Sequence, residues 1–265
     1  MLCCYGLSRM AQFEPMMLPP IPEVAQRVVS AIGRRTVNRD FRQLMGLGAD
    51  VADRFEDHDH SVYLTFDDSP NPLTTPHVLR ALKEQAIVAT FFCIGVNVLR
   101  HPEHALAIVK HGHEVANHSM NHLDLWRVSS RRAMEEIAEC QDVLRDVCGI
   151  EATSFRAPYL HFRRALRAVG KMGIDILAGC DVCPDWRETD AQTIARALER
   201  HVSGGSIVLL HDGLYGVDED LSRRAGMAAA QCLAMAVPQL KARGRRFRTI
   251  AHRRSDTESS TTASG

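Results

Sequence analysis

The sequence predicts an α/β fold built on a parallel sheet or barrel. Between residues 61 and 250, short apolar runs alternate with helical patterns, which is typical of strands connected by crossover helices. The chain has 265 residues, of which 45% are hydrophobic and 24% charged, enough for one large domain with a full core. Clusters of titratable residues directly follow the apolar runs, where parallel folds build their sites.

Two segments flank the domain predicted over residues 61–250. Residues 1–60 are expected to form an N-terminal extension, with a short amphipathic helix over 22–35 and a linker over 46–60. Residues 251–265 are of low complexity and are expected to form a disordered tail.

The first half of the domain reads as two strand–helix units and a further strand. Residues 62–66 form an apolar strand pattern, and a helix follows from Thr75 to about Gln85, with Pro76 at its first turn. The near-continuous apolar run 87–94 is typical of a strand buried on both faces. A helix over 102–111 and a strand over 114–117 come next.

The second half repeats the alternation. A long helix begins at Ser130, and Gly149 stands where a helix C-cap is expected. The remaining elements are predicted as a strand at 153–155, a helix at 162–171, a strand from 174, a helix at 191–201, a strand at 206–210, a helix at 222–242 and a strand at 246–250.

Composition and charge argue against several classes of protein. Lys plus Arg and Asp plus Glu both number 32, so no basic excess predicts nucleic-acid binding, and we interpret the Arg-rich stretch 241–254 as a solvated end. The uncharged apolar run 86–99 is shorter than the roughly 18–20 residues of a membrane span. We therefore expect no nucleic-acid partner and no membrane span.

The N-terminus and the cysteines predict a cytoplasmic location. Prolines interrupt the first 20 residues, which lack the pattern of a secretory signal. Eight cysteines are spread through the chain, often in apolar runs, as in proteins with buried free thiols. The pair Cys180 and Cys183 has a redox-like spacing, but packed thiols are the simpler interpretation.

Five polar clusters follow the predicted strands. They are Asp67-Asp68, the stretch 117–122, the stretch 156–159, Asp185-Trp186 and His211-Asp212. Because the carboxyl ends of parallel strands share one edge, we expect these clusters to form one site.

His118 and His122 are the candidate metal ligands. Their i, i+4 spacing puts two imidazoles on one face, although such a pair taken alone is also compatible with chance. Asp67-Asp68 taken alone could be a simple turn, but two adjacent carboxylates need compensating charge. One Asp can bind a metal while the other acts as a base held by Arg156.

His211 is the candidate proton donor. Its ordinary pKa near 6.5 suits proton transfer, and a carboxylate such as Asp185 would favour its protonated form. A hydrogen-bonded core histidine is the alternative interpretation.

Five segments in this order resemble the polysaccharide deacetylase family with its NodB-homology domain. They are TFDDSPNP, HEVANHSMNH, RAPY, CPDW and IVLLHDG. The resemblance covers about 61–250 and implies a distorted (β/α) barrel. It also implies metal-dependent removal of N-acetyl groups from N-acetylglucosamine units of chitooligosaccharides, giving acetate and a free amine, in nodulation-factor-type synthesis.

The resemblance assigns roles to the residues of the first three segments. Asp67 matches the catalytic base, and Arg156 matches the residue that orients this base. Asp68, His118 and His122 match the ligands of a divalent metal, usually zinc or cobalt.

It assigns roles at the remaining positions as well. The backbone N–H of Tyr159 matches the donor to the oxyanion. His211 matches the general acid and Asp185 its partner, while Trp186 and Leu209 match residues that line the acetyl pocket.

One position departs from the family pattern. The first motif of the family has Gly where this chain has Ser69. Gly tolerates positive φ angles that Ser adopts only with strain, so the turn either keeps an allowed conformation or is strained. The added side chain could also narrow the cleft.

Three alternatives to a chitooligosaccharide deacetylase stay open at this point. The substrate could be another polysaccharide such as peptidoglycan, although the N-terminus shows no export signal. The chain could be a catalytically silent carbohydrate-binding relative, which would not require the full set of metal, base and acid residues. A relative that hydrolyses cyclic amides without metal would not require His118 and His122.

Overall fold

The computed structural model describes residues 51–56, 59–161, 167–170, 173–179, 181–182, 185–187 and 190–252. The helix predicted at 22–35, nearly all of the predicted tail and the Cys180–Cys183 pair lie outside these ranges. The elements in chain order are β1 (Val51–Ala52), β2 (Ser61–Ser69), α3 (Thr75–Glu84), β3 (Thr90–Cys93), α4 (Gly95–Arg100), α5 (Pro102–Lys110), β4 (Glu114–Asn117), α6 (Ser130–Cys148), β5 (Ser154–Phe155), the 3₁₀ turn η2 (Pro158–Leu160), α7 (Arg167–Gly170), β6 (Asp175–Leu177), β7 (Asp181–Val182), α8 (Ala191–His201), β8 (Ile207–His211), α9 (Glu219–Ala242) and β9 (Arg246–Phe247).

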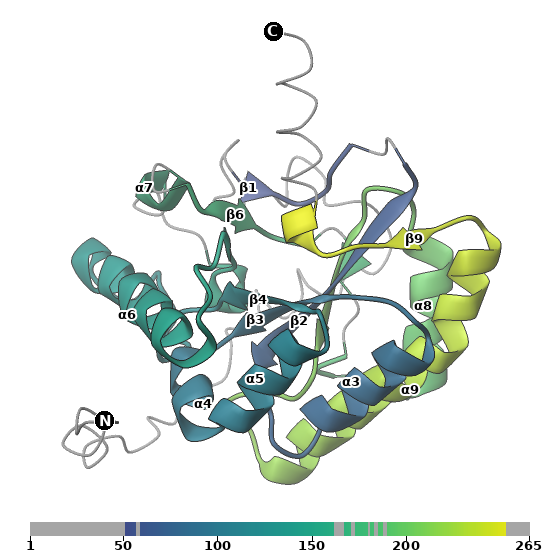
Figure 1. Cartoon of the computed structure of the whole chain (residues 1–265), viewed down its shortest axis with the longest axis horizontal. Helices are drawn as coiled ribbons and strands as arrows, with labels where there is room; N and C mark the ends of the chain where they lie inside the picture. The colour runs from purple at the N-terminus through teal and green to yellow at the C-terminus, as the bar shows by residue number, and fades with distance from the viewer. Residues whose placement is uncertain are drawn as a thin grey trace, which may run out of the picture.

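The described strands form a curled parallel sheet, which confirms the predicted fold class. Their order is β1-β6-β5-β4-β3-β2-β8-β7, and β9 adds to β2. Figure 1 shows the helices around the outside of this sheet, with α3, α8 and α9 packed together and α4, α5 and α6 beside one another. In the described part of the chain, no helix is long and apolar enough to cross a membrane.

Strand β2 shows how the sheet separates its core from its site. Leu64 and Phe66 pack into the large apolar cluster beneath the helices, while Tyr63 belongs to the smaller cluster inside the curled sheet. Side chains alternate along a strand, so Thr65 and Asp67 point to the same inner side as Tyr63. The strand thereby carries a carboxylate to the inner edge of the sheet.

Capping residues fix the ends of three helices. The hydroxyl of Ser129 accepts a hydrogen bond from the Arg132 N–H at the start of α6, and Gly149 ends this helix with φ 69°. Asp190 and Asp218 cap α8 and α9 in the same way as Ser129. Helix α9 therefore begins at Glu219, three residues before the predicted start.

Two strand predictions were too long. The strand expected at 87–94 is limited to Thr90–Cys93, because the chain turns at Ile94 into helix α4, which the sequence analysis missed. Gly95 allows this close turn, since a Cβ atom there would lie 2.5 Å from the Met120 sulfur. The strand expected at 246–250 ends at Phe247, and Ile250 begins a helical turn that packs into the inner cluster.

The linker predicted over 46–60 is wrong for part of its length. Val51 and Ala52 pair with β6 at the edge of the sheet. The ring of Phe55 is buried and packs edge-to-face on Tyr63, with ring centroids 4.9 Å apart. Apolar residues in this glycine- and acid-rich stretch therefore contribute to the core.

Candidate active site

The register of the sheet brings the predicted site residues together. Asp67 on β2 is the direct neighbour of His211 on β8. On the other side, Cys93, Asn117 and Phe155 are in register across β3, β4 and β5, so the residues that follow Asn117 and Phe155 leave the sheet at one edge. These residues are His118 and Arg156.

Asp68, His118 and His122 form a buried cluster with the geometry of a metal site. One ligand atom from each lies within 4.8 Å of the others. The Oδ1 atom of Asp68 is 3.0 Å from Nε2 of His122 and 3.5 Å from Nε2 of His118. His118 donates its Nδ1–H to the Arg156 carbonyl at 2.9 Å, which leaves its Nε2 lone pair directed at the cluster.

The cluster fits a divalent cation. Within the described residues, the buried Oδ1 atom of Asp68 has no hydrogen-bond donor, although two histidine nitrogens converge on it. Burial raises the pKa of Asp68, but His122 and His118 more than offset this and hold the pKa well below its usual range. A buried carboxylate oxygen facing two imidazole nitrogens is a donor set suited to zinc or a similar ion.

Asp67 is held by a buried guanidinium. Arg156 is fully buried and donates from Nη1 to Asp67 Oδ1 at 2.6 Å and to Thr65 Oγ1 at 2.8 Å. Its guanidinium also lies 4.2 Å from the centre of the Phe92 ring. The second oxygen of Asp67 is 3.9 Å from His118 Nε2, so it faces the cluster. One oxygen of Asp67 is thus held by Arg156 while the other faces Asp68, His118 and His122.

His211 and Asp185 form a hydrogen-bonded pair on the opposite side. Asp185 accepts from the backbone N–H of His211 at 2.6 Å and from its Nδ1–H at 2.9 Å. Burial lowers the pKa of His211, but the charge and hydrogen bond of Asp185 outweigh it, and the pKa is raised to about 9. Trp186 packs edge-on against the His211 ring, 5.9 Å between centroids.

This pair gives a pH prediction. The resemblance assigns His211 the role of general acid, which must be protonated, so kcat/KM is expected to fall as pH rises through about 9, where His211 loses its proton. The Asp185→Asn substitution removes the charge that raises this pKa and should move the alkaline limb down by about one unit or more. Because the pKa of His211 is higher in the folded protein than in the unfolded chain, protonation of His211 also stabilises the fold. This stabilisation is fully present below pH ~6.5 and is lost as the pH rises from ~6.5 to 9. Profiles of kcat/KM against pH for the wild type and for Asp185→Asn check the expected change in activity. An alkaline limb at the same pH in both proteins would contradict the assignment of His211 as the general acid.

Tyr159 and Leu209 complete the predicted set. Tyr159 follows Arg156 in the turn η2, and its ring packs on His122 with centroids 4.8 Å apart. Leu209 is buried on β8, two residues before His211. It packs closely on Gly179, because a Cβ atom added to this glycine would lie 3.0 Å from the Cβ atom of Leu209. The roles predicted for the Tyr159 N–H and for the Leu209 side chain stay predictions.

The loops of the site contain several non-glycine residues in the left-handed region. Their φ angles lie between 55° and 66°, at Asp68, Ser119, His122, Tyr159 and Leu160. Non-glycine residues adopt this region at a cost, and such residues gather at functional sites.

The question raised by Ser69 has a structural answer. The residue with positive φ in this turn is Asp68, at 65°, and Ser69 itself does not adopt a positive φ. The Ser69 side chain is fully buried and donates to Asp212 Oδ1 at 2.8 Å. Its hydroxyl is therefore directed at the buried Asp212 carboxyl.

The sequence analysis missed two functional contacts around this turn. The carboxyl of Asp212 is fully buried and also accepts from the Thr75 hydroxyl; burial, with the nearby Asp68 charge, raises its pKa to about 7. The backbone N–H of Tyr215 donates to Asp68 Oδ2 at 2.9 Å. The sequence places Asp212 in the polar cluster after β8, but nothing in the sequence indicates that its carboxyl bonds to Ser69 and Thr75. Nothing in the sequence points to the contact of the Tyr215 N–H.

Replacing Ser69 by Ala is expected to destabilise the protein by about 1–3 kcal/mol. The substitution leaves a buried oxygen of Asp212 without one of its donors. Ser130 is exposed at the start of α6, so Ser130→Ala should change stability by less than about 0.5 kcal/mol. Urea unfolding of the three proteins measures the difference, and equal stability of both variants would rule out a supporting role for the Ser69 hydroxyl.

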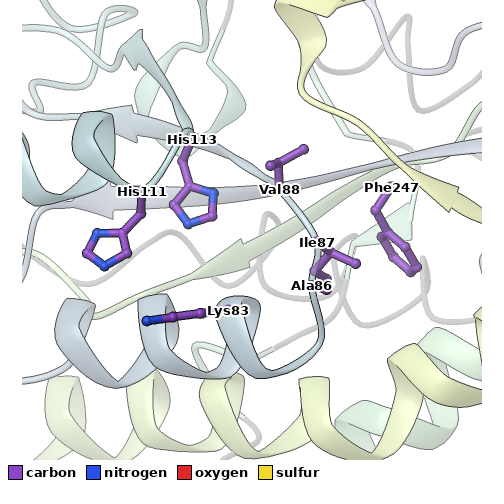
Figure 2. Close-up of a pocket in the computed structure, with 7 residues that line it drawn as sticks. All are labelled: Lys83, Ala86, Ile87, Val88, His111, His113 and Phe247. Carbon is purple, nitrogen blue, oxygen red and sulfur yellow. The ribbon is translucent and has the colours of Figure 1, made fainter.

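An open pocket lies at the other end of the sheet. Its volume is about 420 Å³, and it is lined by Lys83, Ala86, Ile87, Val88, His111, His113 and Phe247 (Figure 2). These residues include those that precede β3 and β4, so the pocket opens at the amino ends of these strands. Burial lowers the pKa of His113 to about 4. The pocket contains none of the predicted site residues.

Comparisons with known proteins agree with the geometry. Residues 55–177 match the family described as polysaccharide deacetylase. A chitooligosaccharide deacetylase from Bradyrhizobium sp. (strain ANU 289) is 36% identical over 189 residues, covering 69% of this chain and 86% of that protein. The peptidoglycan-N-acetylmuramic acid deacetylase PdaC of Bacillus subtilis (strain 168) is 37% identical over 152 residues, covering 57% of this chain but only 32% of that longer protein.

A solved structure extends the agreement to the fold. The crystal structure of a peptidoglycan N-acetylglucosamine deacetylase superimposes with a TM-score of 0.71 at 27% identity, covering 76% of this chain and 91% of that one. The resemblance found in the sequence is therefore confirmed. The chain belongs to the polysaccharide deacetylase family, and it is an enzyme of the carbohydrate N-deacetylase class.

Proposed function

We propose that this chain removes N-acetyl groups from N-acetylglucosamine units of chitooligosaccharides with the help of one divalent metal ion, zinc or cobalt. The observation that carries the proposal is the buried Asp68 oxygen that faces His118 and His122 without a hydrogen-bond donor among the described residues. The similarity to a chitooligosaccharide deacetylase over most of that protein's length supports the substrate.

In the proposed reaction, the ion held by Asp68, His118 and His122 would polarise the amide carbonyl and acidify a water molecule. Asp67 takes a proton from this water through the oxygen that faces the cluster, while Arg156 fixes its other oxygen. The water oxygen attacks the carbonyl carbon as it loses this proton. The Tyr159 N–H donates to the oxygen that becomes negatively charged.

The leaving group requires a proton, because an amine anion leaves poorly. His211 provides this proton from its Nε2 atom, since Asp185 accepts from its Nδ1–H and favours the charged ring. Trp186 beside His211 and Leu209 on the same strand line the space for the acetyl methyl group. The C–N bond breaks as the nitrogen takes the proton from His211, and acetate and a free amine leave the site.

Mass spectrometry of chitopentaose incubated with zinc- or cobalt-loaded protein tests the proposal. Loss of one acetyl group with the wild type, and none with Asp67→Asn, is the expected result. Loss of several groups would indicate a broader chitin-type deacetylase. No mass change on any N-acetylglucosamine oligomer, with one metal bound per chain, would refute the proposed substrate.

Peptidoglycan is the second candidate substrate, because PdaC is 37% identical over 152 residues. Acetate release from purified peptidoglycan, measured beside chitopentaose at equal sugar concentration, distinguishes the two. A preference for peptidoglycan would also count against the cytoplasmic location expected from the sequence, since this polymer lies outside the cell membrane.

A further inference from the structure

A pair of stacked rings lies on the surface near the site. The Trp126 and His161 rings are almost parallel, with an interplanar angle of 8° and centroids 4.5 Å apart. Trp126 is 42% exposed. We call Trp126 and His161 the aromatic platform; the proposed reaction uses neither residue.

One carboxylate contacts both residues of the aromatic platform. Asp124 Oδ1 accepts from the backbone N–H of Trp126 at 3.0 Å and from the Nδ1–H of His161 at 2.9 Å. Its other oxygen is 3.3 Å from Nε of Arg127. The side chain of Asp124 is only 13% exposed. Asp124 therefore holds the backbone of Trp126 and the ring of His161, and the indole stacks on this held ring.

The aromatic platform is continuous with the metal cluster. The His161 ring lies 6.1 Å from the Tyr159 ring, and the Tyr159 ring lies 4.8 Å from His122. A line of rings thus runs outward from His122 through Tyr159 and His161 to Trp126. In the proposed reaction, the sugar unit that is deacetylated lies at the inner end of this line, which places a neighbouring unit of the same oligosaccharide toward the outer end.

We infer that the aromatic platform is a binding subsite for a sugar unit next to the one that is deacetylated. This rests on the proposed function, because it presupposes an oligosaccharide in the cleft. A pyranose ring has an apolar face of C–H groups that packs on an exposed indole, and a fixed ring binds with less loss of conformational freedom. The guanidinium of Arg127 is half-exposed beside the platform and can donate to a hydroxyl or acetamide oxygen.

The inference predicts a dependence on substrate length. Trp126→Ala should raise KM for chitopentaose by roughly tenfold, since stacking is worth on the order of a tenfold change in affinity. For chitobiose, which cannot fill as many subsites, kcat/KM should change by less than about twofold. Trp126→Phe keeps an aromatic ring at this position, so its KM for chitopentaose should stay much closer to that of the wild type than the KM of Trp126→Ala. Leu106→Ala, at an apolar residue that is 46% exposed on α5, is the matched control.

A binding measurement separates this inference from the proposed function. The chain has two tryptophans, so in Asp67→Asn/Trp186→Phe protein the emission comes from Trp126 alone. Titration with chitopentaose should change this emission saturably. Calorimetry is done on Asp67→Asn protein that keeps Trp186, so that the pocket of the proposed function is intact. The further substitution Trp126→Ala should weaken the calorimetric Kd about tenfold.

Three results would overturn the inference. Calorimetric binding that Trp126→Ala leaves unchanged would refute the subsite and leave the proposed function intact. An equal loss of kcat/KM on chitobiose and chitopentaose would assign Trp126 a structural role instead. Absence of calorimetric binding by any N-acetylglucosamine oligomer would refute the proposed function first, and the subsite with it.

Discussion

Replacing Asp67 by Asn is expected to lower kcat/KM by about 10²–10⁴-fold, the range measured for removal of a general base. The amide has the same shape as the carboxylate, and its oxygen can still accept from Nη1 of Arg156. It cannot take a proton from water, so chemistry is lost while the geometry is kept. Steady-state acetate release on chitopentaose measures the effect.

The controls for Asp67→Asn separate chemistry from folding and metal binding. Bound metal should stay near one per chain, because Asp68 and both histidines are unchanged. Asp220→Asn makes the same chemical change at a side chain that is 57% exposed and should leave kcat/KM within about twofold. Activity of Asp67→Asn within tenfold of the wild type would assign the role of base to another group.

Replacing His122 by Ala is expected to reduce both bound metal and activity to near background. His122 provides one of three ligands, and its Nε2 atom makes the shorter of the two contacts with Asp68 Oδ1. With two ligands left, affinity for zinc should fall at least about 10²-fold, beyond the effect of losing an outer-shell partner. Metal analysis by mass spectrometry and acetate release measure the two losses.

Chelation provides a second test of the metal cluster. Wild-type protein treated with a chelator should lose activity and regain it with zinc or cobalt, whereas His122→Ala should regain none at the same concentrations. His111 is exposed at the end of α5, so His111→Ala should behave as the wild type. Full activity of chelated wild-type protein, with no metal detected, would contradict the proposed metal dependence.

Local sequence signals predicted most of the described elements. Helix α6 carries its own boundaries, because Ser129 and Gly149 act on backbone groups within one turn of the helix ends. Helix α4 could not be found in this way. It continues from an apolar run without a capping side chain, and its first N–H groups bond to the carbonyls of Ser119 and Met120, which are distant in sequence.

The same distinction between local sequence signals and long-range contacts holds for the candidate site. The chemical side chains follow apolar strands, and their order carries a family pattern, so Asp67, His118 and His211 could be named from the sequence. The partners that hold them depend on register and loop geometry. The Arg156 carbonyl that orients His118 and the Tyr215 N–H on Asp68 are backbone groups, and no residue type marks such a contact in a sequence.

The left-handed residues around the site have a consequence for how the protein can change. A non-glycine residue in this region costs on the order of 1–2 kcal/mol, which the rest of the fold must offset. Glycine at Tyr159 or Ser119 would relieve this cost in the native state but would let the loop relax away from the geometry around Asp68, His118 and His122. Selection for thermostability and selection for turnover should therefore pull these positions in opposite directions. Variants that gain heat resistance without losing catalysis are most easily sought in the helices outside the sheet.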